Sequence, residues 1–255
     1  MITLLTDFGT ADHFVGVMKG VIAGIAPGVP VVDLSHEVPA FDVMTAAFLL
    51  EQSWRYFPKG TVHVAVVDPG VGSARRGILV EAEGHLFVGP DNGIFSFVLG
   101  DRARVLDKPA FWLPTVSATF HGRDVFAPVA AYLSTGVKPA RMGGWILDAH
   151  RLTGLVPTSF SPGAWTGVVL HVDRFGNVIT NFSVAQFPDL SERRFEMVGG
   201  ARRSETWART YASCPDGVLC LIPGSSGYYE ISMKEGSAAV RTGLAAGAVV
   251  ELKLI

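Results

Sequence analysis

The sequence predicts an α/β N-terminal domain with a doubly wound, mainly parallel sheet, followed by a smaller all-β, barrel-like C-terminal domain. In residues 1–150, short apolar β-type runs alternate with segments of helical periodicity. Residues 164–255 instead contain short strand-like runs separated by glycine-rich turns. Residues 151–163, between these regions, are rich in turn-forming residues and weakly periodic, which indicates an interdomain linker.

Two strands of the N-terminal half end at an aspartate. The first strand stops before Asp7 and the third before Asp68, while His36 follows the second strand. Because the carboxyl ends of parallel strands meet at one edge of a sheet, we expect these three side chains to face one crevice. The spacing of apolar residues predicts strands at 2–5, 29–34 and 62–67, a hairpin of 77–82 with 86–88, and helices at 14–25, 43–56, 94–99 and 127–133.

The C-terminal half contains three turn-rich stretches that are candidates for ligand binding. The stretch 171–177 offers an aromatic ring, Phe175, and an amide, Asn177, which together suit a nucleobase. The stretches 224–230 and 236–239 offer hydroxyl and backbone donors, but each of the three is more often an ordinary hairpin turn. The strands expected here are 167–173, 194–198, 206–212, 218–222, 228–233 and 249–254.

Composition and charge exclude several classes of protein. The net charge is −2 and no block of Lys and Arg occurs, which argues against binding of nucleic acid or of a membrane surface. No leader pattern is present and no window approaches the ~18 apolar residues of a membrane span, so we expect a cytoplasmic protein with a small-molecule substrate. Cys214 and Cys220 are too few for a disulfide framework or a zinc site and are expected to be packing residues. Dinucleotide, P-loop, zinc-peptidase and serine-hydrolase motifs are absent.

The stretch HVAVVDPGVGSARR, residues 63–76, brings unlike chemical groups together. Asp68 ends a strand, the turn after it can expose backbone amides, and Arg75 and Arg76 follow at once. A strand-ending turn with no further role is an equally good interpretation of this stretch alone. His121 has polar neighbours and could project towards the same site, whereas Arg123 and Asp124 are expected to pair locally and cap a helix.

Seven stretches, taken together and in order, resemble the S-adenosylmethionine hydrolases (adenosine-forming), also called SAM hydroxide adenosyltransferases, which are related to the fluorinating and chlorinating enzymes. The resemblance runs nearly end to end. It implies the two domains described above, a homotrimer with active sites between neighbouring subunits, and the reaction of S-adenosylmethionine with water to give adenosine and L-methionine without a metal or other cofactor. The stretches are TDFGTADHFVGVMKGVI, DLSHEVPAFDV, FPKGTVHVAVVDPGVGSARR, VGPDNG, FHGRDVFAPVAAYL, VDRFGNVITN and SSGYYEIS with GSAA.

The resemblance also implies functional residues. The catalytic set would be Asp68, Arg75 and His121, although the adjacent Arg76 could be mistaken for Arg75. Asp12 and the Ser225–Ser226 turn would lie near the methionine end, and Phe175 would lie against the adenine. On physical grounds we further expect Phe41 to form, with Phe175, a hydrophobic wall that excludes other water. The adenosine contacts would fall on Asp7, Asp68, Asn177, Ser225, Glu230 and the backbone of Ala238.

This set suits attack of water at C5′ of a sulfonium. The leaving group is a neutral thioether and needs no acid, so the enzyme must supply an oriented oxygen nucleophile. Arg75 can stabilise hydroxide-like charge, and neutral His121 can accept a proton or orient the water. Asp68 could bind ribose hydroxyls, orient His121 or hold the water.

Two other functions are compatible with the sequence. A halogenase should offer the halide small neutral donors, but Asp68, Val71 and Gly122 stand where the fluorinating enzyme carries Tyr, Thr and Ser, and its long insertion is missing. An anionic Asp68 would repel fluoride. A non-catalytic sensor that binds S-adenosylmethionine or adenosine differs from the hydrolase only in turnover.

Overall fold

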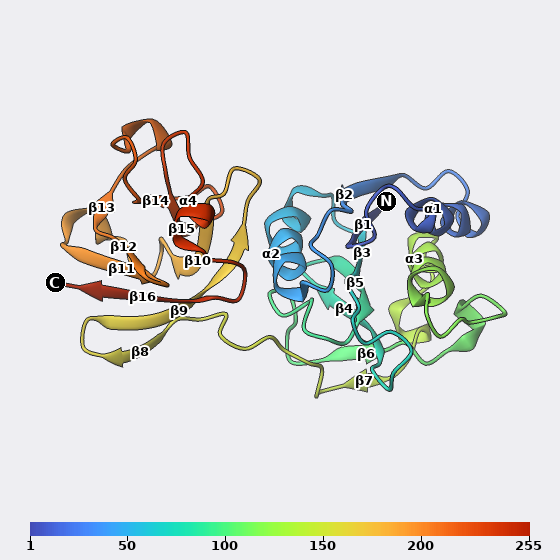
Figure 1. Cartoon of the computed structure of the whole chain (residues 1–255). Coiled ribbons are helices and arrows are strands. Elements are labelled where there is room, and N and C mark those ends of the chain that lie inside the picture. Colours follow the sequence, from blue (N-terminus) through green and yellow to red (C-terminus); the bar gives the residue numbers. More distant parts are fainter. The chain divides into compact units, whose positions relative to one another are not determined.

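The computed structural model describes residues 1–255, which form two compact units, Met1–Leu152 and Thr153–Ile255 (Figure 1). The segment expected as a linker, 151–163, is not entirely a connection. It contains a short strand, β8 (Thr158–Ser161), which pairs with β9 (Ala164–Val172). Part of the expected linker therefore belongs to the C-terminal sheet.

The N-terminal unit is built on a mixed seven-stranded sheet with the order β2-β1-β3-β5-β4-β6-β7. The β2-β1-β3-β5 half is parallel, whereas β4, β6 and β7 pair antiparallel. The expectation of a mainly parallel sheet therefore holds only for this half, because the hairpin at its edge reverses the chain. The strands are β1 (Ile2–Thr6), β2 (Val31–Ser35), β3 (Val62–Val66), β4 (Gly77–Ala82), β5 (His85–Pro90), β6 (Ala103–Val105) and β7 (Trp145–Ile146).

Helices cover both faces of this sheet (Figure 1). Side chains alternate along a strand, so Leu4 packs with α1 (Phe14–Ile25) and α3 (Ala127–Ser134), while Leu5 packs with α2 (Val43–Ser53) on the other face. All of β1 and β3 is buried. This double burial explains why these strands are apolar runs, and it leaves only their ends free to carry polar groups.

The N-terminal unit departs from the expected elements in three respects, although the helix expected at 127–133 is present as α3. Residues 94–99 form hydrogen-bonded turns and no helix, since Gly93 (φ +96°) opens the segment and the Ser96 and Val98 amides bond the carbonyls three residues earlier. The strands β6 and β7 have three and two residues, too short to give a periodic signal. The helix expected at 127–133 is preceded by a π-type turn at Gly122–Phe126.

The C-terminal unit contains a nine-stranded, nearly closed barrel-like sheet with the order β12-β11-β16-β9-β10-β15-β14-β13 and with β8 beside β9. Its core is apolar and includes Phe182, Met197, Leu221 and Leu252. The remaining strands are β10 (Val178–Ser183), β11 (Phe195–Gly199), β12 (Arg202–Ser204), β13 (Thr206–Trp207), β14 (Cys220–Pro223), β15 (Tyr228–Ser232) and β16 (Val249–Leu254).

Two C-terminal expectations are wrong in detail. The strand expected at 206–212 is only β13, after which the chain forms a 3-10 turn at Tyr211–Ser213. The turn expected at 236–239 leads into a short helix, α4 (Ala238–Thr242), whose first turn is capped by the Ser237 side chain. Cys214 and Cys220 are buried free thiols, as expected for packing residues.

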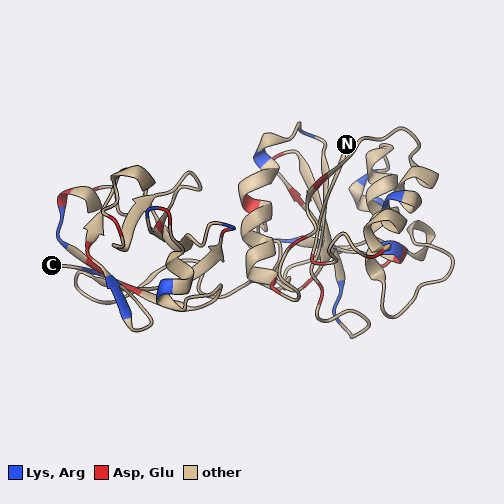
Figure 2. Cartoon of the chain, turned by 45° about the horizontal axis from the view of Figure 1, so that its top comes forward, with Lys and Arg blue, Asp and Glu red and all other residues tan.

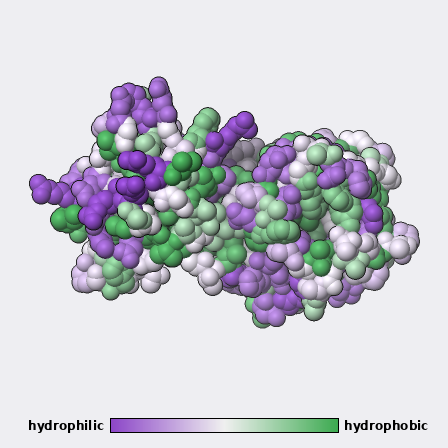
Figure 3. Space-filling model, viewed as in Figure 1, coloured by the Kyte–Doolittle hydropathy of each residue, from purple (hydrophilic) through white to green (hydrophobic).

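Charged side chains are interspersed along both units. Lys and Arg occur singly or in small groups among Asp and Glu and do not gather along one element (Figure 2). On the face seen in Figure 3, hydrophilic and hydrophobic residues are intermingled. None of the helices has the length and apolar character needed to cross a membrane.

Candidate active site

Neighbouring strands deliver Asp7 and Asp68 to the same edge of the N-terminal sheet. β1 and β3 pair in parallel with Thr6 opposite Val66, so the residues just after them emerge side by side. Both aspartates line a cavity of about 300 Å³, here called the N-terminal cavity. Its lining residues are Asp7, Phe8, Phe14, Ala40, Phe41, Val66, Asp68, Val71, Thr119, Phe120, His121 and Gly122.

Arg75 joins Asp68 to His121. Its Nε donates to Asp68 Oδ1 at 2.9 Å, and its Nη2 contacts both Asp68 Oδ2 and, at 2.8 Å, His121 Nδ1. The side chains of Arg75 and Asp68 are only 11% and 5% exposed, so each ion compensates the other's loss of water. The structure thus brings together the three residues expected to form one set.

The contact with Arg75 determines the state of His121. A guanidinium has no acceptor, so Nδ1 must accept from Arg75, and the proton of the neutral ring is on Nε2. Burial lowers the pKa of His121, the Arg75 charge lowers it further, and Asp68 and Asp124 oppose these effects only in part. In this arrangement His121 is a neutral hydrogen-bond donor, not a proton acceptor.

The loops that carry Arg75 and His121 approach each other closely at Gly72. Gly72 has φ +77°, and a Cβ on it would lie 2.3 Å from the carbonyl oxygen of Ala118. Only glycine allows this contact. On the Arg75 side, the turn is closed by hydrogen bonds from Ser73 N to Gly70 O and from Arg75 N to Ser73 Oγ.

Arg76 faces other partners. Its guanidinium binds Asp91 Oδ2 at 2.7 Å and Asp148 Oδ1 at 2.8 Å, and the Asp91 side chain is only 4% exposed. No contact joins Arg76 to Asp68 or His121. Of the two adjacent arginines, only Arg75 belongs to the cluster at the cavity.

Asp7 has a structural contact in addition to its place in the cavity. Its Oδ2 accepts the Phe41 N–H at 2.9 Å, while Oδ1 makes no hydrogen bond within the chain. Phe41 has φ +68°, which is unfavourable for a residue with a Cβ, and its side chain is 70% exposed at the cavity.

Two other expected residues do not line the cavity. Asp12 is exposed elsewhere, and His36, which was expected to face the crevice, is buried and only 5% exposed.

Aromatic residues form a wall that the sequence reasoning missed. The rings of Phe8, Phe14 and Phe120 have centroids 5.2–5.8 Å apart. Phe8 and Phe120 could have been found from the sequence, because each lies next to a predicted site residue, Asp7 or His121.

Arg123 and Asp124 pair locally, as expected. The Asp124 carboxylate does not cap a helix, however, and instead accepts the Ser117 N–H at 2.8 Å.

The C-terminal unit contains a second cavity of about 750 Å³, here called the C-terminal cavity. Asp173 organises one wall, since its Oδ1 accepts the N–H groups of Phe175 and Asn177 and its Oδ2 accepts from Asn177 Nδ2. Phe175 is 77% exposed, and Asn177 Oδ1 remains free as an acceptor. The lining residues are Asp173, Phe175, Asn177, Tyr211, Ser225, Met233, Glu235, Gly236 and Ser237.

A buried carboxyl lies behind this cavity. Glu230 is 4% exposed and accepts hydrogen bonds from Tyr211 Oη and, at 3.2 Å, from Ser232 Oγ. Burial raises the pKa of Glu230, and its two hydrogen bonds oppose the rise only in part. Tyr211, which the sequence reasoning missed, thus joins the cavity to Glu230.

Two other residues expected at the C-terminal site do not line the cavity. Ser226 lies beside Ser225 with its hydroxyl oxygen buried. Ala238 is fully buried in the first turn of α4, and its carbonyl accepts from Thr242 Oγ1. No group of three or more His, Cys, Asp or Glu side chains in residues 1–255 is arranged to hold a metal ion.

Comparison with known proteins places this geometry in a family. Residues 2–143 match the SAM hydroxide adenosyltransferase N-terminal domain, and residues 167–251 match the C-terminal domain of the same family. The chain is 41% identical to an (R)-S-adenosyl-L-methionine hydrolase of Thermus thermophilus, with 97% of each chain covered. A fluorinase of Actinoplanes sp. is 27% identical over 71% of each chain.

A solved structure supports the same placement. The crystal structure of an uncharacterized conserved protein from Thermotoga maritima matches with a TM-score of 0.89 and 34% identity, and the match covers 99% of this chain and 100% of that one. Both halves of the chain match consecutive domains of one family, and the matches to whole proteins run nearly end to end. The chain therefore belongs to the SAM hydroxide adenosyltransferase family.

Proposed function

We propose that the protein hydrolyses S-adenosyl-L-methionine by attack of water at C5′, giving adenosine and L-methionine. The observation that carries this proposal is the Asp68–Arg75–His121 cluster at the N-terminal cavity. The hydrolase named at 41% identity, which the chain matches over nearly its whole length, supports the same reaction.

In this reaction the C5′–S bond breaks and a C5′–O bond forms. The electron pair of the broken bond stays on sulfur as a neutral thioether, and the attacking water loses one proton. Arg75 stabilises negative charge that develops on the attacking oxygen, and the Nε2–H of His121 orients that oxygen towards C5′. Because His121 Nδ1 is occupied by Arg75, the proton passes to Asp68 or to solvent. The step needs neither a metal nor another cofactor.

The two cavities have complementary chemistry. The N-terminal cavity offers the free Oδ1 of Asp7 for ribose hydroxyls and aromatic walls for the apolar part of the substrate. The C-terminal cavity offers Phe175 for stacking and Asn177 for a nucleobase edge. In the proposed homotrimer, active sites form between neighbouring subunits and each draws on both kinds of cavity. Light scattering that shows an active monomer would contradict this assembly.

The direct test is chromatography of S-adenosylmethionine incubated with the protein in water, with and without chloride or fluoride. Adenosine and methionine are expected far beyond one equivalent per chain, with or without halide. A 5′-halogenated nucleoside would identify a halogenase, and binding without turnover would identify a sensor. The ionised Asp68–Arg75 pair disfavours the halogenase, since a carboxylate beside the nucleophile repels a halide.

Replacing Asp7 by alanine is expected to weaken adenosine binding about 10- to 100-fold, because a charged acceptor for the ribose hydroxyls is lost. The Phe41 turn also loses its hydrogen bond to Asp7. Isothermal titration calorimetry with adenosine measures the change. Asp101→Ala is the control, since it removes the same charge from an exposed residue without a described partner. Equal affinities of the two variants would exclude Asp7 from the binding site.

The kcat is expected to decline at low pH with an inflection below pH 6.5. Burial and the neighbouring Arg75 lower the pKa of His121 below its ordinary value of 6.5, so the neutral ring persists to lower pH. Protonation of His121 places an N–H on Nδ1, which then points at the Arg75 guanidinium, so the hydrogen bond from Arg75 to His121 breaks. His121→Ala should slow turnover and remove this decline. A kcat profile with its inflection above pH 6.5, or one that is unchanged in the variant, would exclude His121 from this role.

A further inference from the structure

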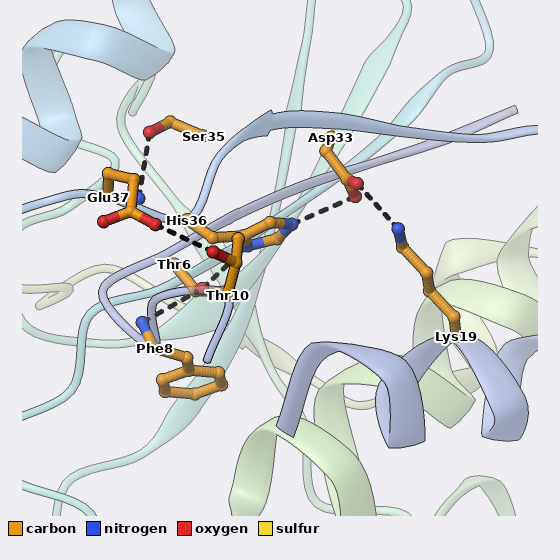
Figure 4. Close-up of polar contacts among 8 residues, drawn as sticks. All are labelled: Thr6, Phe8, Thr10, Lys19, Asp33, Ser35, His36 and Glu37. Carbon is orange, nitrogen blue, oxygen red and sulfur yellow. Dashed lines mark hydrogen bonds and ion pairs between the residues drawn. The ribbon is translucent and has the colours of Figure 1, made fainter. Parts of the chain in front are cut away.

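The turn that carries Asp7 into the N-terminal cavity is held from behind by His36, just after β2 (Figure 4). His36 Nδ1 lies 2.8 Å from Thr6 Oγ1, which in turn accepts the Phe8 N–H at 3.2 Å. The His36 carbonyl accepts the Gly9 N–H at 2.7 Å. One buried residue is therefore connected to both ends of the Asp7–Phe8–Gly9 turn.

The other side of the His36 ring faces Asp33, which connects it to Lys19 (Figure 4). Lys19, Asp33, His36 and Thr6 thus form one polar series that leads to the turn. His36 Nε2 lies 3.0 Å from Asp33 Oδ1, and Lys19 Nζ donates to Asp33 Oδ2 at 2.6 Å. Burial raises the pKa of Asp33, but the contacts with Lys19 and His36 outweigh it and hold that pKa below its usual range. The Asp33 carboxylate can only accept, which favours a proton on Nε2; with Nδ1 unprotonated, the Thr6 hydroxyl donates to it.

This series resembles the acid, imidazole and hydroxyl arrangement of covalent hydrolases, but it cannot act in that way. Thr6 is 0% exposed, and its oxygen is already engaged by His36 and by the Phe8 amide. A nucleophile must reach its substrate. The series ends at the backbone of the turn and acts through it.

On its other side, the Asp7–Phe8–Gly9 turn positions two groups that line the N-terminal cavity, the Asp7 carboxylate and Phe41. Asp7 Oδ2 holds the amide of Phe41, whose positive φ is unfavourable, and Asp7 Oδ1 faces no partner in the chain. Displacing the turn would move the carboxylate and release the Phe41 backbone together. The buried hydrogen bonds behind the turn therefore help to fix both the Asp7 carboxylate and the Phe41 backbone.

We propose that His36 is a positioning residue for substrate binding. Through the Thr6 hydroxyl and its own carbonyl it fixes the Asp7–Phe8–Gly9 turn, and thereby the Asp7 carboxylate and the Phe41 ring. The proposal rests on the proposed function only in that Asp7 binds the ribose of the substrate. Neither His36 nor Thr6 touches the substrate.

The chain supplies a matched control on the same strand. Thr3 Oγ1 lies 2.8 Å from His63 Nδ1, and both residues are fully buried, just as Thr6 pairs with His36. Thr3 is not among the lining residues of the cavity and bonds no part of the turn. Thr6→Val and Thr3→Val therefore remove the same kind of buried hydrogen bond, in one case directly behind the Asp7 turn and in the other away from it.

Thr6→Val is expected to raise the KM for S-adenosylmethionine and the Kd for adenosine about 3- to 10-fold, with kcat much less affected. Thr3→Val should leave both constants unchanged, although thermal melts should show that both variants lose stability. Thr6→Ser, which keeps the hydroxyl, should restore the wild-type Kd. The double variant Thr6→Val/His36→Leu should bind adenosine no more weakly than the weaker single variant, since the two residues act in one series.

Two results would overturn the proposal. One is an equal change of Kd in Thr6→Val and Thr3→Val, which would mean a general effect of buried hydrogen bonds. The other is additive loss of affinity in the Thr6 and His36 variants. If the wild-type protein binds adenosine but makes none from S-adenosylmethionine, the proposed function fails, while the comparison of Kd values still decides the role of His36.

Discussion

Arg75→Ala is expected to lower the kcat for S-adenosylmethionine hydrolysis about 10²- to 10³-fold, the loss typical of one preorganised donor to a developing oxyanion. The guanidinium holds both Asp68 and His121 in place, so its removal disperses the whole cluster. The KM should change much less, because Asp7, Phe175 and Asn177, which are assigned to ribose and adenine, are not part of this cluster. Single-turnover and steady-state kinetics separate the two constants.

Arg76→Ala is the matched control for this variant. Both substitutions remove a guanidinium from a buried carboxylate, since the side chains of Asp68 and Asp91 are 5% and 4% exposed. Both should therefore destabilise the fold, but only Arg75→Ala should lower the kcat of the folded fraction about 10²- to 10³-fold. Arg75→Lys should retain part of the activity, because it keeps the charge and loses the forked geometry. Wild-type kcat in Arg75→Ala, or an equal loss in Arg76→Ala, would exclude the proposed mechanism.

Acidification from pH 6.5 to 5 is expected to cost the N-terminal unit about 2 kcal/mol of folding free energy through His63 alone. His63 is fully buried between Thr3 Oγ1, 2.8 Å away, and His85 Nδ1, 3.1 Å away. Burial, together with the charge of His85, lowers the pKa of His63 from 6.5 to about 3. Between these two values the unfolded chain binds the proton and the folded chain does not.

The stabilisation by neutral His63 is therefore complete above pH 6.5 and is lost as the pH falls towards 3. Urea unfolding at a series of pH values measures the slope. His63→Gln should be less stable than the wild type at pH 7 but should lose less stability between pH 6.5 and about 5, above the range where most carboxylates titrate. His13→Gln, at an exposed position, is the control. Identical slopes for His63→Gln and the wild type would contradict the prediction.

The pattern of apolar residues in the sequence made much of the fold predictable. β1, β3, α1 and α2 are long or strongly apolar, and each was expected within a few residues of its place. The failures have local causes. The apolar run after Gly93 looks like a helix but packs Ile94 and Phe95 into the core as turns, and a two-residue strand such as β7 leaves no period to detect.

The site was predictable only where residues stand at strand ends or in recognisable motifs. Asp7 and Asp68 follow from the parallel sheet, and His121 came from its polar neighbours and the family resemblance. The choice between Arg75 and Arg76 depends on where a loop turns, which no spacing in the sequence specifies. Tyr211 lies far from any motif, and its link to Glu230 is a contact between residues 19 positions apart.

The contact between Gly72 and Ala118 has a consequence for protein engineering. Because the two backbones touch with no room for a methyl group, a side chain at position 72, or a shift of one loop towards the other at this point, would displace the second loop. A designer who wishes to admit a bulkier nucleophile than water must remodel both segments at once. Libraries that keep Gly72 and vary the rest of 70–76 together with 117–121 are therefore the starting point that this contact favours.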